Sequence, residues 1–311
     1  MKKVISTVLI ISAVVLLASC EMSLSVPSGS PLRVLSIGIE SSASSVASDD
    51  AVDFAKAMEG VASRAGADVQ TTVLADTTRI QATKATSRSI ADAIRTLADS
   101  SSNDGTTLVY ISGQGYTRHD ATTADGKGVI FGAKDARFSP DFDYSADFGI
   151  IGESGQIVIT GADLMDQLSQ IDGSVILITD CDHSGALVGS KSIEIDSTDF
   201  NASTSALTSN LFDSSAVDTS KVQILTSSRR YEENGEAKSL GSVEHSAFTA
   251  MMLEGLGYDQ ETQTVKGVIP VAEGNGITMN SLYGYISDRS GESACTPKMS
   301  CAMIDTVLFT F

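Results

Sequence analysis

Two short polar turns carry the side chains that could perform covalent chemistry. One is Asp180-Cys181-Asp182-His183-Ser184-Gly185, which follows the apolar run 175–178, and the other is Ser112-Gly113-Gln114-Gly115, which follows the apolar run 107–111. A cysteine attacks as its thiolate, so it needs a base that removes the thiol proton. Cys181 is therefore a candidate nucleophile, and His119, just after the second turn, is a candidate base.

Alternating strands and helices must position these turns. Short apolar runs predict strands over 32–39, 69–74, 107–111, 175–178, 222–226 and 303–311. Apolar residues at helical spacing predict helices over 48–65, 86–97, 246–256 and 277–290, and a further helix after the N-cap residue Thr160. The stretch 116–156 is expected to be rich in loops, and the polar interval 191–220 is long enough to indicate a functional loop or disorder. This order predicts an α/β fold, a three-layer α/β/α sandwich with a mostly parallel central sheet.

In a parallel sheet, ligand sites form beyond the carboxyl ends of the strands, so both turns are expected at one edge. The run Tyr110-Ile111-Ser112-Gly113-Gln114-Gly115-Tyr116 resembles the Y-x-S-G-H-G turn of the caspase and metacaspase family of cysteine-type endopeptidases (clan CD). In that turn the histidine is the general base. Residues 180–185 resemble the family's D-x-C-H-S-G turn, in which the cysteine is the nucleophile.

Two further segments extend the resemblance. Ile224-Leu225-Thr226-Ser227-Ser228 resembles the strand that follows the catalytic turn. His245-Ser246-Ala247-Phe248-Thr249, with Leu253-Glu254-Gly255-Leu256, is similar to the family's H-G-x-F-T…L-x-x-G-L helix. The resemblance runs from about residue 32 to residue 256, and it implies one caspase-like domain over 32–311.

Both catalytic positions of the family are replaced in this chain. The position of the histidine falls on Gln114, and the position of the nucleophilic cysteine falls on Asp182. An amide does not titrate near neutral pH, and a carboxylate would give only a labile anhydride with a peptide carbonyl. Cys181 is one residue away, and successive strand residues face opposite sides, so we expect it to be a small buried hydrophobe.

The resemblance also implies roles for the neighbouring residues. Asp180 matches an acidic residue that, in metacaspase-like enzymes, helps to hold a basic substrate side chain, and Asp182 beside it would make the pocket unusually acidic. His183 belongs to the turn, where we expect it to pack or to form hydrogen bonds. His245, at the start of a helix, is expected to be a structural or capping residue.

The N-terminal residues have the pattern of a bacterial lipoprotein signal peptide. A basic start, an apolar run too short to span a bilayer and the ending Leu17-Ala18-Ser19-Cys20 predict cleavage after residue 19 and lipidation of Cys20. Residues 20–31 would form a flexible tether, and the domain would be anchored to a membrane of the cell envelope. The alternative is an ordinary cleaved secretory signal.

Charge and cysteine content limit the partners. The formal charge is −18, or −20 once Lys2 and Lys3 are removed with the signal, which argues against nucleic acid as a partner. An exported chain allows a disulfide between Cys295 and Cys301. The run 141–147 alternates acidic residues but lacks the glycine and glutamate of an EF-hand, so no metal or other cofactor is predicted.

Three functions are compatible with these features. The first is a pseudopeptidase that binds a peptide or protein partner without cleaving it. The second is an active cysteine endopeptidase that uses Cys181 and His119 and prefers Lys or Arg because its pocket is acidic. The third is a cation-regulated structural protein of the envelope.

Overall fold

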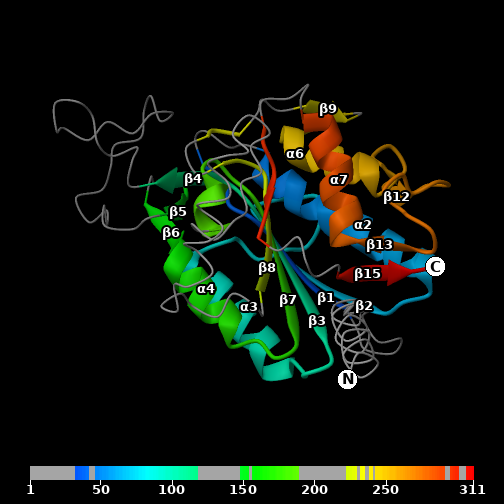
Figure 1. The fold of residues 1–311 in the computed structure, drawn as a ribbon. Helices are drawn as coiled ribbons and strands as arrows, with labels where there is room; N and C mark the ends of the chain where they lie inside the picture. Colours follow the sequence, from blue (N-terminus) through cyan, green and yellow to red (C-terminus); the bar gives the residue numbers. More distant parts are fainter. Residues whose placement is uncertain are drawn as a thin grey trace, which may run out of the picture.

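A six-stranded sheet forms the centre of the protein (Figure 1). The computed structural model describes residues 32–41, 46–117, 148–153, 156–188, 222–229, 232–234, 238–240, 242–290, 295–300 and 306–311. The strands follow the order β14 (Lys298–Met299), β8 (Val222–Thr226), β7 (Ser174–Asp180), β3 (Thr106–Ser112), β1 (Leu32–Gly38) and β2 (Val69–Leu74). Every neighbouring pair is parallel except β14 with β8, so the sheet is mostly parallel, as predicted.

Helices cover both faces of this sheet (Figure 1). One face is covered by α2 (Ala47–Ala65), α6 (Ala247–Gly255) and α7 (Met279–Ser290), and the other by α3 (Ser87–Ser100) and α4 (Gly161–Ser169). The buried apolar residues accordingly separate into two clusters, one on each side of the sheet. The three-layer α/β/α sandwich predicted from the sequence is therefore confirmed.

The central strands send alternate side chains into the two clusters. In β7, Ile176 and Ile178 pack on the side of α2 and α6, whereas Val175 and Leu177 pack on the side of α3 and α4. A strand that is buried on both faces has apolar residues at every position, which explains the continuous apolar run in the sequence. Within β7, even-numbered residues therefore face α2 and α6, and odd-numbered residues face α3 and α4.

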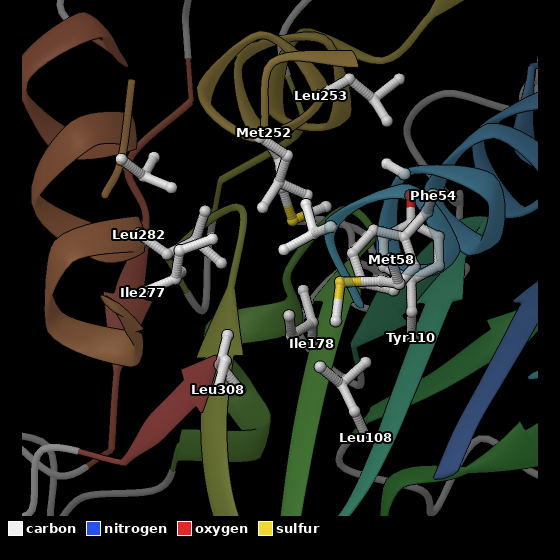
Figure 2. Packing of buried hydrophobic residues seen from close by; sticks show 14 of the residues in the cluster. Phe54, Met58, Leu108, Tyr110, Ile178, Met252, Leu253, Ile277, Leu282 and Leu308 are labelled. Atoms are coloured by element: carbon white, nitrogen blue, oxygen red, sulfur yellow. The ribbon is translucent and has the colours of Figure 1, made fainter. Parts of the chain in front are cut away.

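An aromatic pair fixes α2 over β3 (Figure 2). The ring of Phe54 stacks on the ring of Tyr110, with centroids 4.3 Å apart and an angle of 20° between the planes. Met58, Leu108 and Ile178 belong to the same cluster and lie close to the pair in Figure 2. Such aromatic pairs contribute about 0.5–1.5 kcal/mol beyond the burial of their area, so this contact holds the helix in one position on the sheet.

Short strands outside the main sheet form smaller pairings. β4 (Gln114–Thr117), β5 (Phe148–Ile151) and β6 (Ile157–Thr160) make a three-stranded antiparallel sheet. The other antiparallel pairs are β9 (Lys238–Leu240) with β10 (Val243–His245), β11 (Tyr258–Asp259) with β12 (Thr264–Val265), and β13 (Gly276–Thr278) with β15 (Val307–Thr310). A 3-10 turn, η1 (Ser184–Val188), follows β7.

The loop-rich stretch 116–156 contains two strand segments that were not predicted, β5 and the end of β4. One prediction is wrong at these pairings. The last helix does not begin at residue 277, since residues 276–278 pair with β15 and α7 begins at Met279. A short strand depends on partners that are distant in sequence, so its local pattern is weak.

The helix ends follow local signals. Thr86 and Ser89 form a reciprocal capping box at the start of α3, and Thr160 accepts a hydrogen bond from the Asp163 backbone N–H at the start of α4, as predicted. α2 ends at Gly66, whose φ of 63° lies in the left-handed region that glycine adopts without strain. Among the described helices, none has the length and apolar character that crossing a membrane requires.

Replacement of Phe54 by alanine should lower the free energy of unfolding by about 3–5 kcal/mol, because it removes a buried ring and leaves a cavity. Urea denaturation followed by circular dichroism measures the change. The control is Val268→Ala, which should change the stability by less than about 0.5 kcal/mol, since this side chain is 80% exposed. Equal stability of the two variants would show that Phe54 does not pack between α2 and β3 as described.

Candidate functional site

The two polar turns begin side by side at the carboxyl ends of adjacent strands. β3 and β7 are parallel, and Ser112 pairs with Asp180 in their register. The backbones then touch: a Cβ atom added to Gly115 would lie 1.7 Å from the carbonyl oxygen of Asp182. Only glycine allows this approach, so the turn that carries Gln114 packs directly against the turn that carries Asp182.

Cys181 does not belong to the surface of this edge. Its side chain is fully buried in the cluster on the side of α3 and α4, and its Sγ lies 3.9 Å from the carbonyl oxygen of Ile111. Burial raises the pKa of the thiol well above its ordinary value, and the nearby carboxylates of Asp180 and Asp182 raise it further. The thiol is thus neutral and shielded in this structure. His119 lies outside the described residues.

Asp182 stands at the border between the core and the solvent. It is partly buried, and its Oδ1 accepts a hydrogen bond of 2.6 Å from the backbone N–H of Asn234. The same asparagine donates from Nδ2 to Asp180 Oδ1 at 2.7 Å, and its Oδ1 accepts from the hydroxyl of Ser227 at 2.5 Å. Asn234 therefore connects both aspartates of the turn with the end of β8.

Asn234 was missed by the sequence reasoning. It lies in a short polar segment with no helical or strand periodicity, and no spacing marks it as a partner of residues more than fifty positions away. Only the fold brings it to the turn.

Asp180 is buried beneath the edge, not exposed in it. Only 1% of its surface is accessible, and it accepts hydrogen bonds from the side chains of Ser246, Thr249 and Asn234. Burial raises its pKa, although these hydrogen bonds partly offset the effect. The contacts that Asp180 makes are therefore internal, and Asp182 is the acid of the pair that reaches the surface. The role of both residues in binding a substrate stays a prediction.

His183 has a conformation that supports the turn. Its φ of 58° lies in the left-handed region, its side chain is buried, and its backbone N–H donates to the carbonyl oxygen of Glu232 at 2.8 Å. This arrangement agrees with the packing role expected from the sequence. It also ties the turn to the segment that contains Asn234.

A buried charge cluster lies on the α2 side of the edge. The Nδ1 atom of His245 lies 2.8 Å from Asp50 Oδ1, and its Nε2 atom lies 3.4 Å from Asp53 Oδ2. All three side chains are fully buried. Burial lowers the pKa of His245, but its hydrogen bonds to Asp50 and Asp53 outweigh burial and raise the pKa to about 9.

Asp53 is held ionised by several donors. Burial alone would raise its pKa, but hydrogen bonds from His245 and Arg79 lower it below the ordinary value. Arg79 donates to Asp53 at 2.6 Å and to Asp49 at 2.7 Å, and Tyr258 donates to Asp53 at 3.0 Å.

Asp50 connects this charge cluster to the end of β3. It accepts from the hydroxyl of Ser112 at 2.8 Å and from the backbone N–H of Ser246 at 3.3 Å. Burial raises the pKa of Asp50 to about 7, although the hydrogen bond from His245 lowers it. The sequence did contain a signal: Asp50 and Asp53 are one helical turn apart on a helix whose neighbouring positions are apolar, so both acids face the core.

The described edge contains no thiol and base in contact. Gln114 is almost completely buried and does not titrate, and Asp182 offers a carboxylate in place of a thiol. Within the described ranges, no group of three His, Cys, Asp or Glu residues is placed to hold a metal ion. The edge presents the partly buried carboxylate of Asp182, which the Asn234 backbone N–H holds in place.

Several predicted features lie outside the described residues: the signal peptide with Cys20, the tether 20–31, the acidic run 141–147 and Cys301. Cys295 is buried next to the cluster that contains α7. The disulfide between Cys295 and Cys301 therefore stays a prediction.

Comparisons with known proteins gave structural neighbours only. No family model matches the chain, and no curated protein matches it. Among solved structures, the chain is similar to a structural-genomics target protein from Geobacter sulfurreducens, with a TM-score of 0.48 and 16% identity over 90% of this chain and 98% of that chain. It is also similar to caspase-1 from Spodoptera frugiperda, with a TM-score of 0.48 and 9% identity over 93% of each chain.

The thiol of Cys181 should resist iodoacetamide in the folded protein and react fully in urea, because it is buried and its pKa is raised. Mass mapping of the alkylated peptides measures the modification of each cysteine. The matched control is Asp182→Cys, which adds a second thiol one residue along the chain at a partly exposed position; this new thiol should be alkylated without urea. Rapid native alkylation of Cys181 would show that it does not face the core.

Proposed function

We propose that this chain is a caspase-type pseudopeptidase of the bacterial cell envelope, which binds a peptide or protein partner without cleaving it. The observation that carries the proposal is the register of β3 and β7. Turns that resemble the two catalytic turns of the family begin at the paired residues Ser112 and Asp180, while the catalytic positions hold Gln114 and Asp182.

The replaced residues support binding better than catalysis. Peptide cleavage by this family needs a thiolate that attacks the carbonyl carbon and a base that accepts the thiol proton. Neither an amide nor a carboxylate supplies these functions. Asp182 instead gives the edge a partly buried negative charge, so a partner segment that carries Lys or Arg has the chemistry that fits it.

The alternative is a peptidase that uses Cys181 and His119. It would require the thiol to leave the apolar cluster in which it is buried and to lose its neighbours on the side of α3 and α4. The fixed alternation of β7 opposes this movement.

The location in the envelope is proposed from the N-terminal sequence. Cleavage before Cys20 and lipidation of its thiol would anchor residues 32–311 to a membrane through the tether 20–31. The edge that carries the two turns would then meet partners in the same compartment.

The paired change Gln114→His with Asp182→Cys tests whether the two turns form one site. The wild-type domain should not hydrolyse peptides that end in Arg, Lys or Asp. In the paired variant, the new thiol should react with iodoacetamide faster than in Asp182→Cys alone, because a positioned base contributes about a hundredfold or more to such proton transfers. Mass mapping distinguishes the new thiol from Cys181.

The single variants are the controls, since a base without its thiol and a thiol without its base should each gain little. Equal alkylation rates in Asp182→Cys with and without Gln114→His would show that the turns do not share a site. Hydrolysis by the wild type that Cys181→Ala abolishes would instead establish the active peptidase.

Cys20 should carry the lipid anchor. Labelled fatty acid should enter the wild-type protein in a bacterial host and should not enter Cys20→Ala. Cys295→Ala is the matched control, because it removes a thiol that is buried within the domain. Fatty acid that still enters Cys20→Ala would refute the anchor while leaving the pseudopeptidase proposal intact.

A further inference from the structure

The charge cluster around His245 contains three buried acids and few cations to balance them. Asp50, Asp53 and Asp180 are almost completely inaccessible, yet they lie close enough to influence one another, since the charge of Asp180 disfavours ionisation of Asp50. One buried imidazole and one guanidinium, that of Arg79, face these acids. The proton on His245 is therefore a large part of the positive charge in the cluster.

Charged or titratable groups from several elements lie around the imidazole. They are Asp49, Asp50, Asp53 and Lys56 of α2, Arg79 of the segment after β2, Tyr110 of β3, Asp180 of β7, Tyr258 of β11, and Lys238 of β9, which pairs with His245 in the register of β9 and β10. Lys56 lies farther out, where it forms a hydrogen bond with Gln263 at 2.6 Å.

Gln260 contacts both Asp53 and His245, so its hydrogen bonds depend on whether His245 is protonated. Its Nε2 donates to Asp53 Oδ2 at 2.8 Å and also contacts His245 Nε2, while its Oε1 is buried without a hydrogen-bond partner in the described part of the chain. A neutral imidazole accepts a hydrogen bond at Nε2 from the Gln260 amide. An imidazolium carries a proton there and directs it to Asp53, so the two states need different arrangements of Gln260 and Asp53.

His245 is connected to both turns through its neighbour in the chain. Ser246 caps α6 by accepting a hydrogen bond from the Thr249 backbone N–H at 3.0 Å, and its hydroxyl donates to Asp180. Its backbone N–H donates to Asp50, which also holds Ser112. A displacement of the junction between β10 and α6 would therefore reach the ends of β3 and β7.

We propose that loss of the His245 proton at alkaline pH loosens the junction of β10 and α6 against α2, and with it the two turns at the edge of the sheet. Without that proton, the ion pairs of His245 with Asp50 and Asp53 are lost, and the buried carboxylates repel one another. This device does not depend on which ligand the edge binds.

The direction of the effect follows from the pKa of His245, which the two aspartates raise from 6.5 to about 9. The pKa of His245 is higher when the junction is packed than when it is open. Its proton therefore stabilises the packed junction fully below pH 6.5, and this stabilisation is lost as the pH rises toward about 9. Opening of the junction should thus increase between these two values.

Hydrogen–deuterium exchange of the mature protein tests the proposal. Exchange rates are divided by the intrinsic rate at each pH, and peptides from 238–250 are compared with peptides from the central strand β7. The protection of 238–250 should fall at least about tenfold between about pH 6.5 and pH 9.5, because one unit of pKa shift corresponds to a tenfold change in the equilibrium. The protection of β7 between Ser174 and Ile178 should change much less.

Two variants that keep the histidine move its pKa in opposite directions. Gln260→Glu adds a carboxylate beside the imidazole and should shift the midpoint to higher pH, whereas Asp53→Asn removes one and should shift it to lower pH. A merely structural role does not predict opposite shifts. His183→Asn is the matched control, since it removes another described histidine, tolerates the left-handed backbone and should leave the midpoint unchanged.

His245→Gln should abolish the pH dependence of exchange in 238–250. If this variant does not fold, the opposite shifts of Gln260→Glu and Asp53→Asn decide the matter. The proposal is wrong if the midpoint is the same in both of these variants and in the wild type, or if protection of 238–250 does not change with pH while the histidine is seen to titrate by NMR. Neither result would bear on peptide binding at Asp182.

Discussion

A buried carboxylate at the end of a central strand organises the edge of this protein. Asp180 has almost no access to water, so the structure must supply donors to its oxygens or pay a desolvation cost of several kcal/mol. The donors come from Ser246 and Thr249 on α6 and from Asn234 in the segment after β8. Two distant parts of the chain are therefore fixed around the last residue of β7, and they also fix the position of the turn that follows it.

The same support holds the turn that carries Asp182 against the turn that carries Gln114. Asn234 fixes one oxygen of Asp182, and the backbone of Asp182 packs against Gly115, so the two positions that resemble a catalytic dyad rest on closely packed turns. Preorganisation of this kind lowers the cost of ordering a bound partner as effectively as it would serve catalysis. Such an edge is therefore compatible with the proposed binding of a partner, in which Asp182 would be the partly exposed acid.

Local sequence patterns predicted the strands and helices of the main sandwich because each depends on its own apolar residues. β2 and β8 have the predicted bounds, and α2 and α6 differ from theirs by one residue. The antiparallel pairs were not predicted, since strands of two to four residues depend on partners that are far away in the sequence. Asp50 was missed although its apolar neighbours on the helix indicate that it faces the core, because an acid on a helix is normally exposed and its partners His245 and Ser112 are distant in the sequence.

The alternation of β7 places the Cys181 thiol on the side of the sheet opposite Asp180. Val175, Leu177 and Cys181 share one side of the sheet, whereas Ile176 and Ile178 face the other side together with Asp180. Bringing the Cys181 thiol to the side of Asp180 through a register slip of one residue would exchange these sets and would move Asp180 away from Ser246 and Thr249. The slip would place a carboxylate among aliphatic side chains, at a cost of several kcal/mol.

A local unwinding after Asp180 would avoid that cost, but it would break two hydrogen bonds that hold the turn. These are the bonds from the hydroxyls of Ser227 and Ser228 to the Cys181 carbonyl oxygen. The sulfur of Cys181 is therefore part of the core, and Asp182 is the residue of the pair whose side chain is partly exposed.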